Sequence, residues 1–518
     1  LLGSAMIYRY WREPNNPAIL GVAWTIELVL VEILAFFTDS LLLLSAANVL
    51  LALGSLSLGN QAAIAPPPLA RLSSFKLLPL VYGGIALSLR LNAFNAYTGL
   101  ITLGVAIAGL GTGAKLRGGK PISYLSILGI TCGFYELVAY QLLQGRGGSP
   151  ADALTIFALV TAAIALIYRL GATLWHAQDR DRWLNFRLAE LKIIAHSHWA
   201  LACLLKLVAA SYAITGNPRL SWLSLSLSVA LAAYALIQAR DTSDGDRGTA
   251  RDWWVYVGLV EITATTVYAR RLLADLLVLD PWRVLLVSLV SLVIYQLPWR
   301  SLGWEATPWR RFSLAIPALT LLATTDHLSY LNILAVAAFY ARIAFSQRNW
   351  RWSYLSLAFI DWAIFRWLLA VGLTDFLYFA SAIGASLLFI AQFDPDLQES
   401  SQKQIRHWLR LLGSGIIGLT AVLFHQQTGL LPAALGLGFT FGGLGLQIRA
   451  FLWVGTVTFL GTTCYQLVIL SVNYPFLKWV LGLAAGVILL SIGARFERHR
   501  GQIIVMLHHW LSRLETWE

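Results

Sequence analysis

Residues 18–38 read AILGVAWTIELVLVEILAFFT, an apolar run in which Glu27 and Glu32 are the charged side chains. A helix needs about 20 mostly apolar residues to cross the hydrocarbon core of a bilayer. This run is therefore predicted to be a transmembrane helix. Its apolar residues are continuous and do not alternate with a period of two, which excludes a strand of a membrane β-barrel.

The same pattern recurs along the whole chain. It predicts an all-α, polytopic integral membrane helix bundle of about 16–18 transmembrane helices, because two of the runs, 75–90 and 311–325, are short enough to be half-helices. The expected spans are residues 18–38, 40–59, 75–90, 96–112, 122–143, 152–175, 193–214, 219–238, 253–273, 281–298, 311–325, 328–346, 353–372, 374–393, 408–425, 428–447, 450–471 and 475–494.

The composition excludes a set of soluble domains. Hydrophobic residues make up 58% of the 518 residues and charged residues 12%, whereas soluble domains carry about 25% charged residues. The mean hydropathy is +0.67, so lipid is expected to be the solvent for most of the surface. The three cysteines lie inside apolar runs. No disulfide framework, metal site or cofactor is therefore expected. The chain begins at Leu1 without a signal-peptide pattern, and we expect it to be the membrane part of a longer protein.

The basic residues predict the orientation. With the N-terminus inside, about 29 of the 38 Lys and Arg residues fall on cytoplasmic connections, as the positive-inside rule requires. Both termini are therefore expected in the cytoplasm. We expect the net charge of +12 to interact with the anionic lipids of the inner leaflet and not with nucleic acid. Residues 1–494 are expected to form the transmembrane bundle, and residues 495–518 a juxtamembrane basic amphipathic helix.

The C-terminal segment combines basic and aromatic side chains. Arg495, Arg498 and Arg500 follow the last span, and apolar residues including Trp510 and Trp517 then recur at helical spacing. This pattern predicts a helix lying in the membrane interface. A helix that binds a protein partner or a second copy is the alternative. Residues 176–192 have a similar pattern and predict a second interfacial helix.

Short motifs suggest duplicated helix hairpins. A Ser followed by an aromatic residue and Leu opens several spans, with Ser available as a helix N-cap. Duplication of hairpins, as in many transporters, would explain the recurrence, and so would convergent interface chemistry. The motif begins at Ser123, Ser221, Ser329 and Ser353.

Ionisable residues within spans are the candidate functional residues, because they are costly in lipid. They serve either an ion, proton or substrate pathway or, as the structural alternative, interhelical contacts. His196, Trp199, Cys203 and Lys206 share one helical face. Asp361 and Arg366 are five residues apart, so each is expected to face a different neighbour. The candidates are Glu27, Glu32, Glu136, His196, Lys206, Glu261, Asp361 and Arg366.

Other chemistries fit less well. The glycine-rich residues 109–120 lack the Ser/Thr that follows Lys in a phosphate-binding loop, since Pro121 follows Lys120. We expect a flexible inner loop there. Histidines lack the paired spacing that a haem bundle needs. Asp39, Asp326 and His327 are expected at the outer face, where a lipid-linked glycosyltransferase would keep a catalytic carboxylate, but the loops are short.

One resemblance is visible in the C-terminal tail. Residues 490–503, LSIGARFERHRGQI, and residues 510–518, WLSRLETWE, resemble the tail of large cyanobacterial membrane proteins of unknown function, and residues 135–141, YELVAYQ, add to it. The resemblance implies a bacterial inner (plasma) or thylakoid membrane and no assigned activity. It transfers no functional residue.

The sequence therefore favours a transporter- or flippase-like carrier without enzymatic chemistry. The alternative is a non-enzymatic membrane scaffold or complex-assembly protein that binds partners through its tail and inner loops. A lipid-linked glycosyltransferase is less favoured. A carrier requires the ionisable residues of several spans to converge on one cavity, whereas a scaffold would keep them in separate pairs.

Overall fold

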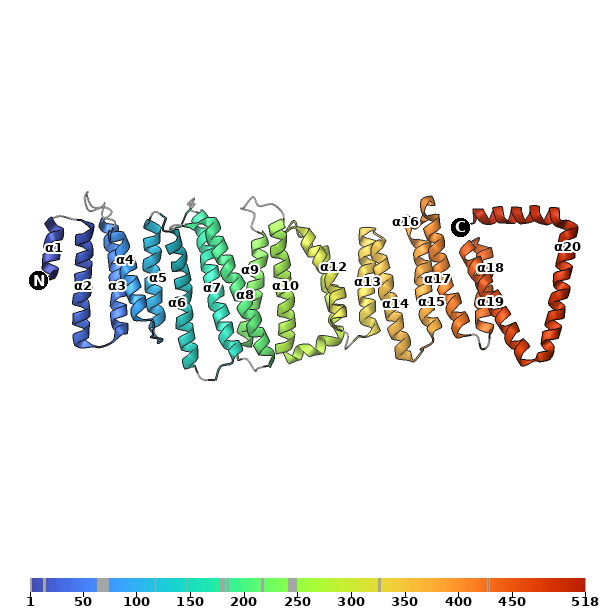
Figure 1. The fold of residues 1–518 in the computed structure, drawn as a ribbon, viewed down its shortest axis with the longest axis horizontal. Helices are drawn as coiled ribbons and strands as arrows, with labels where there is room; N and C mark the ends of the chain where they lie inside the picture. Colours follow the sequence, from blue (N-terminus) through green and yellow to red (C-terminus); the bar gives the residue numbers. More distant parts are fainter. Residues whose placement is uncertain are drawn as a thin grey trace. The chain divides into compact units, whose positions relative to one another are not determined.

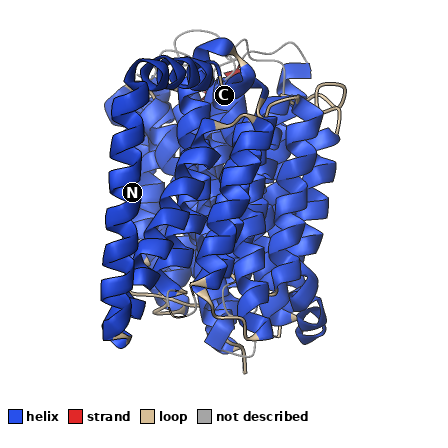
Figure 2. Ribbon diagram, turned by 90° about the vertical axis from the view of Figure 1, so that its right-hand side faces the viewer, coloured by secondary structure: helices blue, strands red, loops and turns tan. Residues whose placement is uncertain are grey.

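The structure is a computed structural model that describes residues 2–12, 15–62, 74–116, 118–145, 147–177, 182–183, 186–215, 219–240, 249–324, 328–425, 427 and 429–517. These residues are helical almost throughout (Figure 2). The predicted all-α class is confirmed. A single antiparallel ribbon of two very short strands is the exception within the described ranges.

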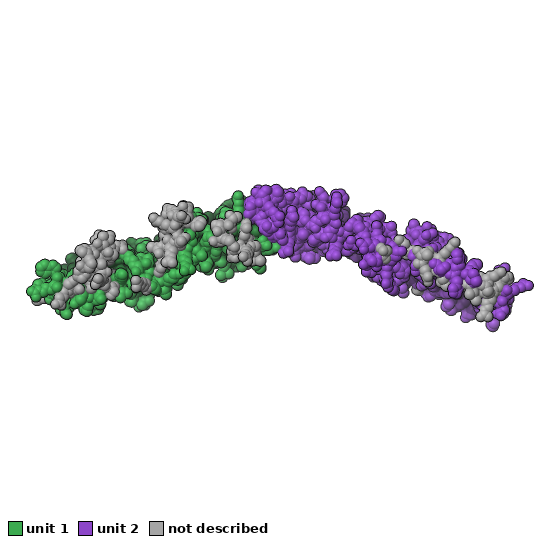
Figure 3. Space-filling view, turned by 90° about the horizontal axis from the view of Figure 1, so that it is seen from above, with its two compact units in different colours: residues 1–277 green, residues 278–518 purple. Residues whose placement is uncertain are grey.

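The chain divides into two compact units, coloured separately in Figure 3. Unit 1 is Leu1–Leu277. Its elements are α1 (Leu2–Arg12), α2 (Asn16–Phe37), α3 (Leu41–Ala62), α4 (Ser74–Leu89), α5 (Thr98–Lys115), α6 (Lys120–Gln144), α7 (Pro150–Ala177), β1 (Arg182–Trp183), β2 (Phe186–Arg187), α8 (Leu188–Thr215), α9 (Ser221–Arg240) and α10 (Thr249–Leu272).

Unit 2 is Val278–Glu518. The short helix η2 (Ala274–Trp282) contains the boundary between the units. The elements that follow are α11 (Arg283–Gln296), α12 (Ala306–Leu322), α13 (Tyr330–Gln347), α14 (Arg351–Val371), α15 (Phe376–Phe393), α16 (Pro395–Gln398), η4 (Ser400–Gln402), α17 (Lys403–Phe424), α18 (Leu430–Leu446), α19 (Arg449–Asn473) and α20 (Pro475–Thr516).

Each predicted span coincides with one helix. Within the described residues, 13 helices are long and apolar enough to cross a membrane, and they mark the chain as a multi-pass membrane protein. Five helices are shorter or more polar than this criterion allows: α4, α10, α12, α13 and α18. The segmentation of the sequence is therefore confirmed, while the number of helices that meet the criterion is lower than the predicted 16–18.

Within each unit, extensive packing joins helices that are close in sequence. Consecutive hairpins such as α3–α4, α5–α6, α7–α8 and α9–α10 form the main contacts of unit 1, and neighbouring hairpins also contact each other, as α4 does with α5 and α6 with α7. Figure 1 shows this order along each unit. Small residues allow the close approach that membrane helices favour. A Cβ atom on Gly99 of α5, for example, would lie 2.7 Å from the carbonyl oxygen of Gly133 in α6.

Two predictions about connections are wrong. The loop predicted at residues 109–120 is wrong for its first part: residues 109–115 belong to α5, where Gly109 and Gly113 face Ser126 and Ser123 of α6. Residues 176–192 do not form an interfacial helix. Their described part contains the end of α7, the β1–β2 ribbon and the start of α8. Phe186 of the ribbon is fully buried, so its apolar side chain fills the protein interior instead of lying in lipid.

The Ser motif acts as a helix N-cap at Ser329 but not at Ser123 or Ser353. Ser329 is the N-cap of α13 and accepts a hydrogen bond from the Leu331 N–H at 3.3 Å. Ser123 and Ser353 instead lie inside helices and donate to the carbonyl oxygens of Gly119 and Trp350. A shared sequence pattern thus has different local roles.

The last span and the amphipathic tail form one helix, α20. Figure 1 shows that the terminal part of α20 turns away from the upright part and runs across the view. Its end reaches α19, because Arg449 Nε donates to the carbonyl oxygen of Trp517 at 3.2 Å. The tail therefore returns to the end of α19 at which Arg449 lies.

Candidate functional site

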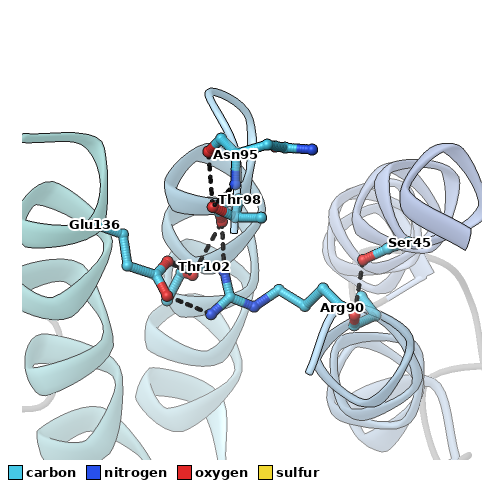
Figure 4. A network of polar contacts seen from close by, with 7 residues as sticks. Ser45, Arg90, Asn95, Thr98, Thr102 and Glu136 are labelled. Carbon is cyan, nitrogen blue, oxygen red and sulfur yellow. Dashed lines mark hydrogen bonds and ion pairs between the residues drawn. The ribbon is translucent and has the colours of Figure 1, made fainter. Parts of the chain in front are cut away.

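Glu136 lies at the centre of a polar network between α4, α5 and α6 (Figure 4). Arg90, which directly follows α4, donates from Nη1 to Glu136 Oε2 at 2.7 Å and from Nη2 to Oε1 at 2.5 Å. Thr102 of α5 also donates to Oε2, at 2.5 Å. The two charged side chains are 15% and 25% exposed. Glu136 is thus fully engaged in a two-point ion pair.

The same arginine, Arg90, also links the connection between α4 and α5 to the first turn of α5. Arg90 Nη1 donates to the Thr98 carbonyl oxygen at 2.6 Å, and Thr98 itself hydrogen-bonds to Asn95 through its side chain. These contacts hold the short connection between α4 and α5 against the first turn of α5 (Figure 4). The network therefore has the features of an interhelical clamp.

A second cluster lies between α8, α9 and α10. His196 Nδ1 is 3.1 Å from the Tyr234 hydroxyl, and the Trp199 indole donates to the Leu231 carbonyl at 3.0 Å. One turn further, Cys203 lies close to Glu261 of α10. The predicted stripe on α8 does face α9 and α10.

Lys206 completes this stripe. It is 5% exposed, and its Nζ lies 3.8 Å from the centroid of the Tyr268 ring in α10. Glu261, also on α10, attracts its charge. A buried ammonium is stabilised in this way by a ring face and a nearby carboxylate. Three of the predicted residues therefore lie in one cluster: His196, Lys206 and Glu261.

Glu27 and Glu32 have different environments although both lie on α2. Glu27 is 7% exposed and accepts a hydrogen bond from Asn48 Nδ2 of α3 at 2.8 Å. Glu32 is exposed on the surface of the helix. The two carboxyls thus do not form one site.

The ionisable residues of unit 2 also have separate partners. Ser386 of α15 donates to Asp361 Oδ1 of α14 at 2.7 Å. Arg366 donates from Nη2 to the carbonyl oxygen of Leu328 at 3.1 Å. The expectation that Asp361 and Arg366 face different neighbours agrees with this geometry.

The tail residues are largely exposed. The side chains of Arg495, Arg498 and Trp510 are accessible, while Trp517 receives the Arg449 contact through its backbone. Arg500 lies within α20, and its side chain is outside the described residues, as are Asp326 and His327.

Sequence reasoning missed several partners. Asn48 is an isolated polar residue in an apolar run, and this signal could have identified it. Arg90 lies in a short connection between two spans, and nothing in its position along the sequence indicates its contact with Glu136. The contact between Asp375 and His425 was not predicted either, although His425 Nε2 lies 2.7 Å from Asp375 Oδ2. Each pair joins residues far apart in sequence, so its distance depends on helix packing.

Within the described ranges, no group of three or more His, Cys, Asp or Glu side chains could hold a metal ion. Comparison with protein-family models, curated proteins and solved structures finds no match to this chain.

Proposed function

We propose that this chain is a non-enzymatic membrane scaffold or complex-assembly protein. The observation that carries the proposal is the separation of its intramembrane charges. In unit 1, Glu27 contacts Asn48 between α2 and α3, Glu136 contacts Arg90 at α4 and α6, and Lys206 lies with Glu261 between α8 and α10. Side chains that interact in separate helix pairs stabilise the packing of those pairs.

The arrangement of the helices supports this proposal. A carrier usually needs two groups of helices around a central site, whereas the extensive contacts in each unit join sequence neighbours. A cavity of about 260 Å³ between α1, α2, α3 and α4 is lined mainly by apolar side chains, and so is a cavity between α17 and α19. Such cavities suit acyl chains better than polar solutes.

The tail provides surface for partners. In the span Lys478–Arg498 of α20, no other part of the described chain buries the apolar residues. Arg495 and Arg498 lie at the basic C-terminal end of this span. We propose that the tail lies on an anionic cytoplasmic leaflet of a bacterial plasma or thylakoid membrane, with both termini cytoplasmic. This placement agrees with the positive-inside distribution and with the resemblance of the tail to cyanobacterial membrane proteins. A protein partner bound through the same amphipathic helix remains part of the proposal.

A transporter- or flippase-like carrier is the second candidate. The observation in its favour is the cluster of His196, Lys206 and Glu261, which brings protonatable groups of two helices together. A lipid-linked glycosyltransferase has less support, because Asp39 lies in a short connection between α2 and α3.

A paired experiment separates scaffold from carrier. Purification in a gentle detergent, followed by cross-linking mass spectrometry, is expected to show one or more membrane proteins in fixed stoichiometry. Vesicles containing the pure chain should be tight to H⁺, Na⁺ and a fluorescently labelled phospholipid. Flux of any of these probes that disappears in Lys206→Met or Glu261→Gln, at unchanged folded yield, would reject the scaffold and support the carrier.

A further inference from the structure

The pair Glu27–Asn48 lies in the middle of α2 and in the first half of α3. Glu27 is 7% exposed and Asn48 fully buried. Asn48 Nδ2 donates to Glu27 Oε1 at 2.8 Å and to the Leu44 carbonyl oxygen at 3.1 Å. Both amide hydrogens of Asn48 are therefore used.

Two oxygen atoms of this pair are left over. Glu27 Oε2 and Asn48 Oδ1 are buried, and among the described residues neither has a hydrogen-bond partner. Rotating the Asn48 amide by 180° does not help, because Oδ1 would then face the Leu44 carbonyl, which is also an acceptor. What is missing at this site is a hydrogen-bond donor.

An ionised Glu27 would also lack a charge partner. Within the described part of the chain, no ion pair involves Glu27, and Arg90 is engaged with Glu136. A buried carboxylate with a single hydrogen bond is strongly disfavoured in an apolar interior. One positive charge bound at Oε2 would remove this cost. If that charge is a proton, it also supplies the missing hydrogen-bond donor.

We propose that Glu27 and Asn48 form a proton-binding site within the membrane. The proton is taken from water, forms an O–H bond at Glu27 Oε2 and donates to Asn48 Oδ1. The carboxyl and the carboxamide are then joined by two hydrogen bonds in opposite directions. A metal ion fits less well, because hard cations need about six oxygen ligands.

The surrounding contacts hold this pair in place. The Tyr82 hydroxyl of α4 donates to the Ala23 carbonyl of α2 at 2.9 Å, one turn from Glu27. Ser45 of α3 donates to the Ala86 carbonyl of α4 at 2.7 Å. Among the residues that the structure describes, the titratable groups facing this region are Tyr82 from α4 and Tyr10 from α1, which share a cavity lining with Ala23. α3 contributes Asn48 and serines, which do not titrate near neutral pH. Both phenols are uncharged near neutral pH, so neither supplies a charge to balance an ionised Glu27.

Infrared spectroscopy of the full chain in lipid vesicles tests the site. At pH 7 the wild-type protein should show the carbonyl band of a protonated carboxyl that is lost in Glu27→Gln. The matched control is Glu32→Gln, on the exposed side of the same helix, which should keep the band. The amide introduced by Glu27→Gln retains a donor for Asn48 Oδ1, so this variant should fold with an unchanged thermal midpoint.

A second variant tests the partner. Asn48→Leu removes the acceptor, so the carbonyl band should remain but move to higher frequency, as for a carboxyl with a weaker hydrogen bond. Loss of carboxylate bands in Glu27→Gln, without loss of a carbonyl band, would overturn the proposal. If those carboxylate bands respond to NaCl against choline chloride, the site binds Na⁺; if they do not, an ionised, hydrated carboxyl occupies it. None of these outcomes depends on the scaffold proposal.

Discussion

Arg90 and Glu136 form a two-point ion pair between the end of α4 and the middle of α6, with nitrogen–oxygen distances of 2.7 and 2.5 Å. The guanidinium fork matches the carboxylate geometry and fixes both position and orientation. Thr102 and Thr98 extend the contact to α5. Three consecutive helices of unit 1 are therefore joined through a single arginine.

Breaking this pair on one side should destabilise the protein. Arg90→Leu leaves the Glu136 carboxylate with Thr102 as its partner, and we expect a loss of about 2–3 kcal/mol, somewhat below that of fully buried pairs, since both side chains keep some exposure. Thermal unfolding of detergent-purified protein, followed by tryptophan fluorescence, measures the loss. The double variant Arg90→Leu/Glu136→Leu should recover part of it. A double variant less stable than either single one would contradict the clamp.

The close contact between α15 and α17 depends on Gly384. A Cβ atom there would lie 2.6 Å from the Gly413 carbonyl oxygen, which is backbone and cannot rotate away. Gly384→Ala is therefore expected to cost about 1–3 kcal/mol through overpacking. Gly415→Ala on α17 is the matched control, because nothing lies within 4 Å of its Cβ position. Equal unfolding midpoints for the two variants would show that α15 and α17 do not approach this closely.

Asp375 combines two roles at the start of α15. Its Oδ1 accepts the Leu377 N–H at 2.9 Å as an N-cap, and its Oδ2 contacts His425 after α17. Asp375→Ala should lower stability by about 1 kcal/mol or more, the typical loss for an N-cap. Asp375→Asn keeps a cap acceptor and should lose less. Chemical unfolding in a detergent series ranks the two variants, and the reverse order would reject the capping role.

The face of Tyr268 is expected to stabilise the buried Lys206. Tyr268→Leu removes the ring and should destabilise the protein by about 1–2 kcal/mol, the range for a desolvated cation–π contact. Tyr268→Phe keeps the ring and loses the hydroxyl contact with Ser224, so its effect should be smaller. Unfolding midpoints in the same detergent provide the comparison. A phenylalanine variant as unstable as the leucine variant would assign the effect to the hydroxyl group.

The basic end of α20 is expected to enrich anionic lipid around the protein. Arg495→Gln/Arg498→Gln should weaken this preference by about 1 kcal/mol per charge. Mass spectrometry of lipids retained after purification from mixed vesicles measures the change, with Lys478→Gln at the opposite end of the α20 span as control. Unchanged lipid retention in the double variant would place the tail away from the anionic surface.

Local sequence patterns predicted the helices well, because length and hydropathy act within one segment. Residues 18–38 became α2 and residues 353–372 became α14, since a continuous apolar run satisfies its backbone hydrogen bonds only as a helix in lipid. The errors at residues 109–115 and 176–192 have a common cause. The glycine residues suggested a flexible loop and the aromatic residues an interfacial helix. The local structure at Gly113 and Phe186 instead depends on the neighbours that these residues contact.

The sequence by itself determined the class of protein, the helix positions and the residues whose charges are costly in a membrane. The tertiary structure alone decided which partners those charges have. Glu27 and Glu32 lie on one helix and are chemically identical, yet the first is buried against Asn48 and the second is exposed. That difference arises because α3 packs against one side of α2 only, and no pattern within a single helix specifies which side its neighbour will cover.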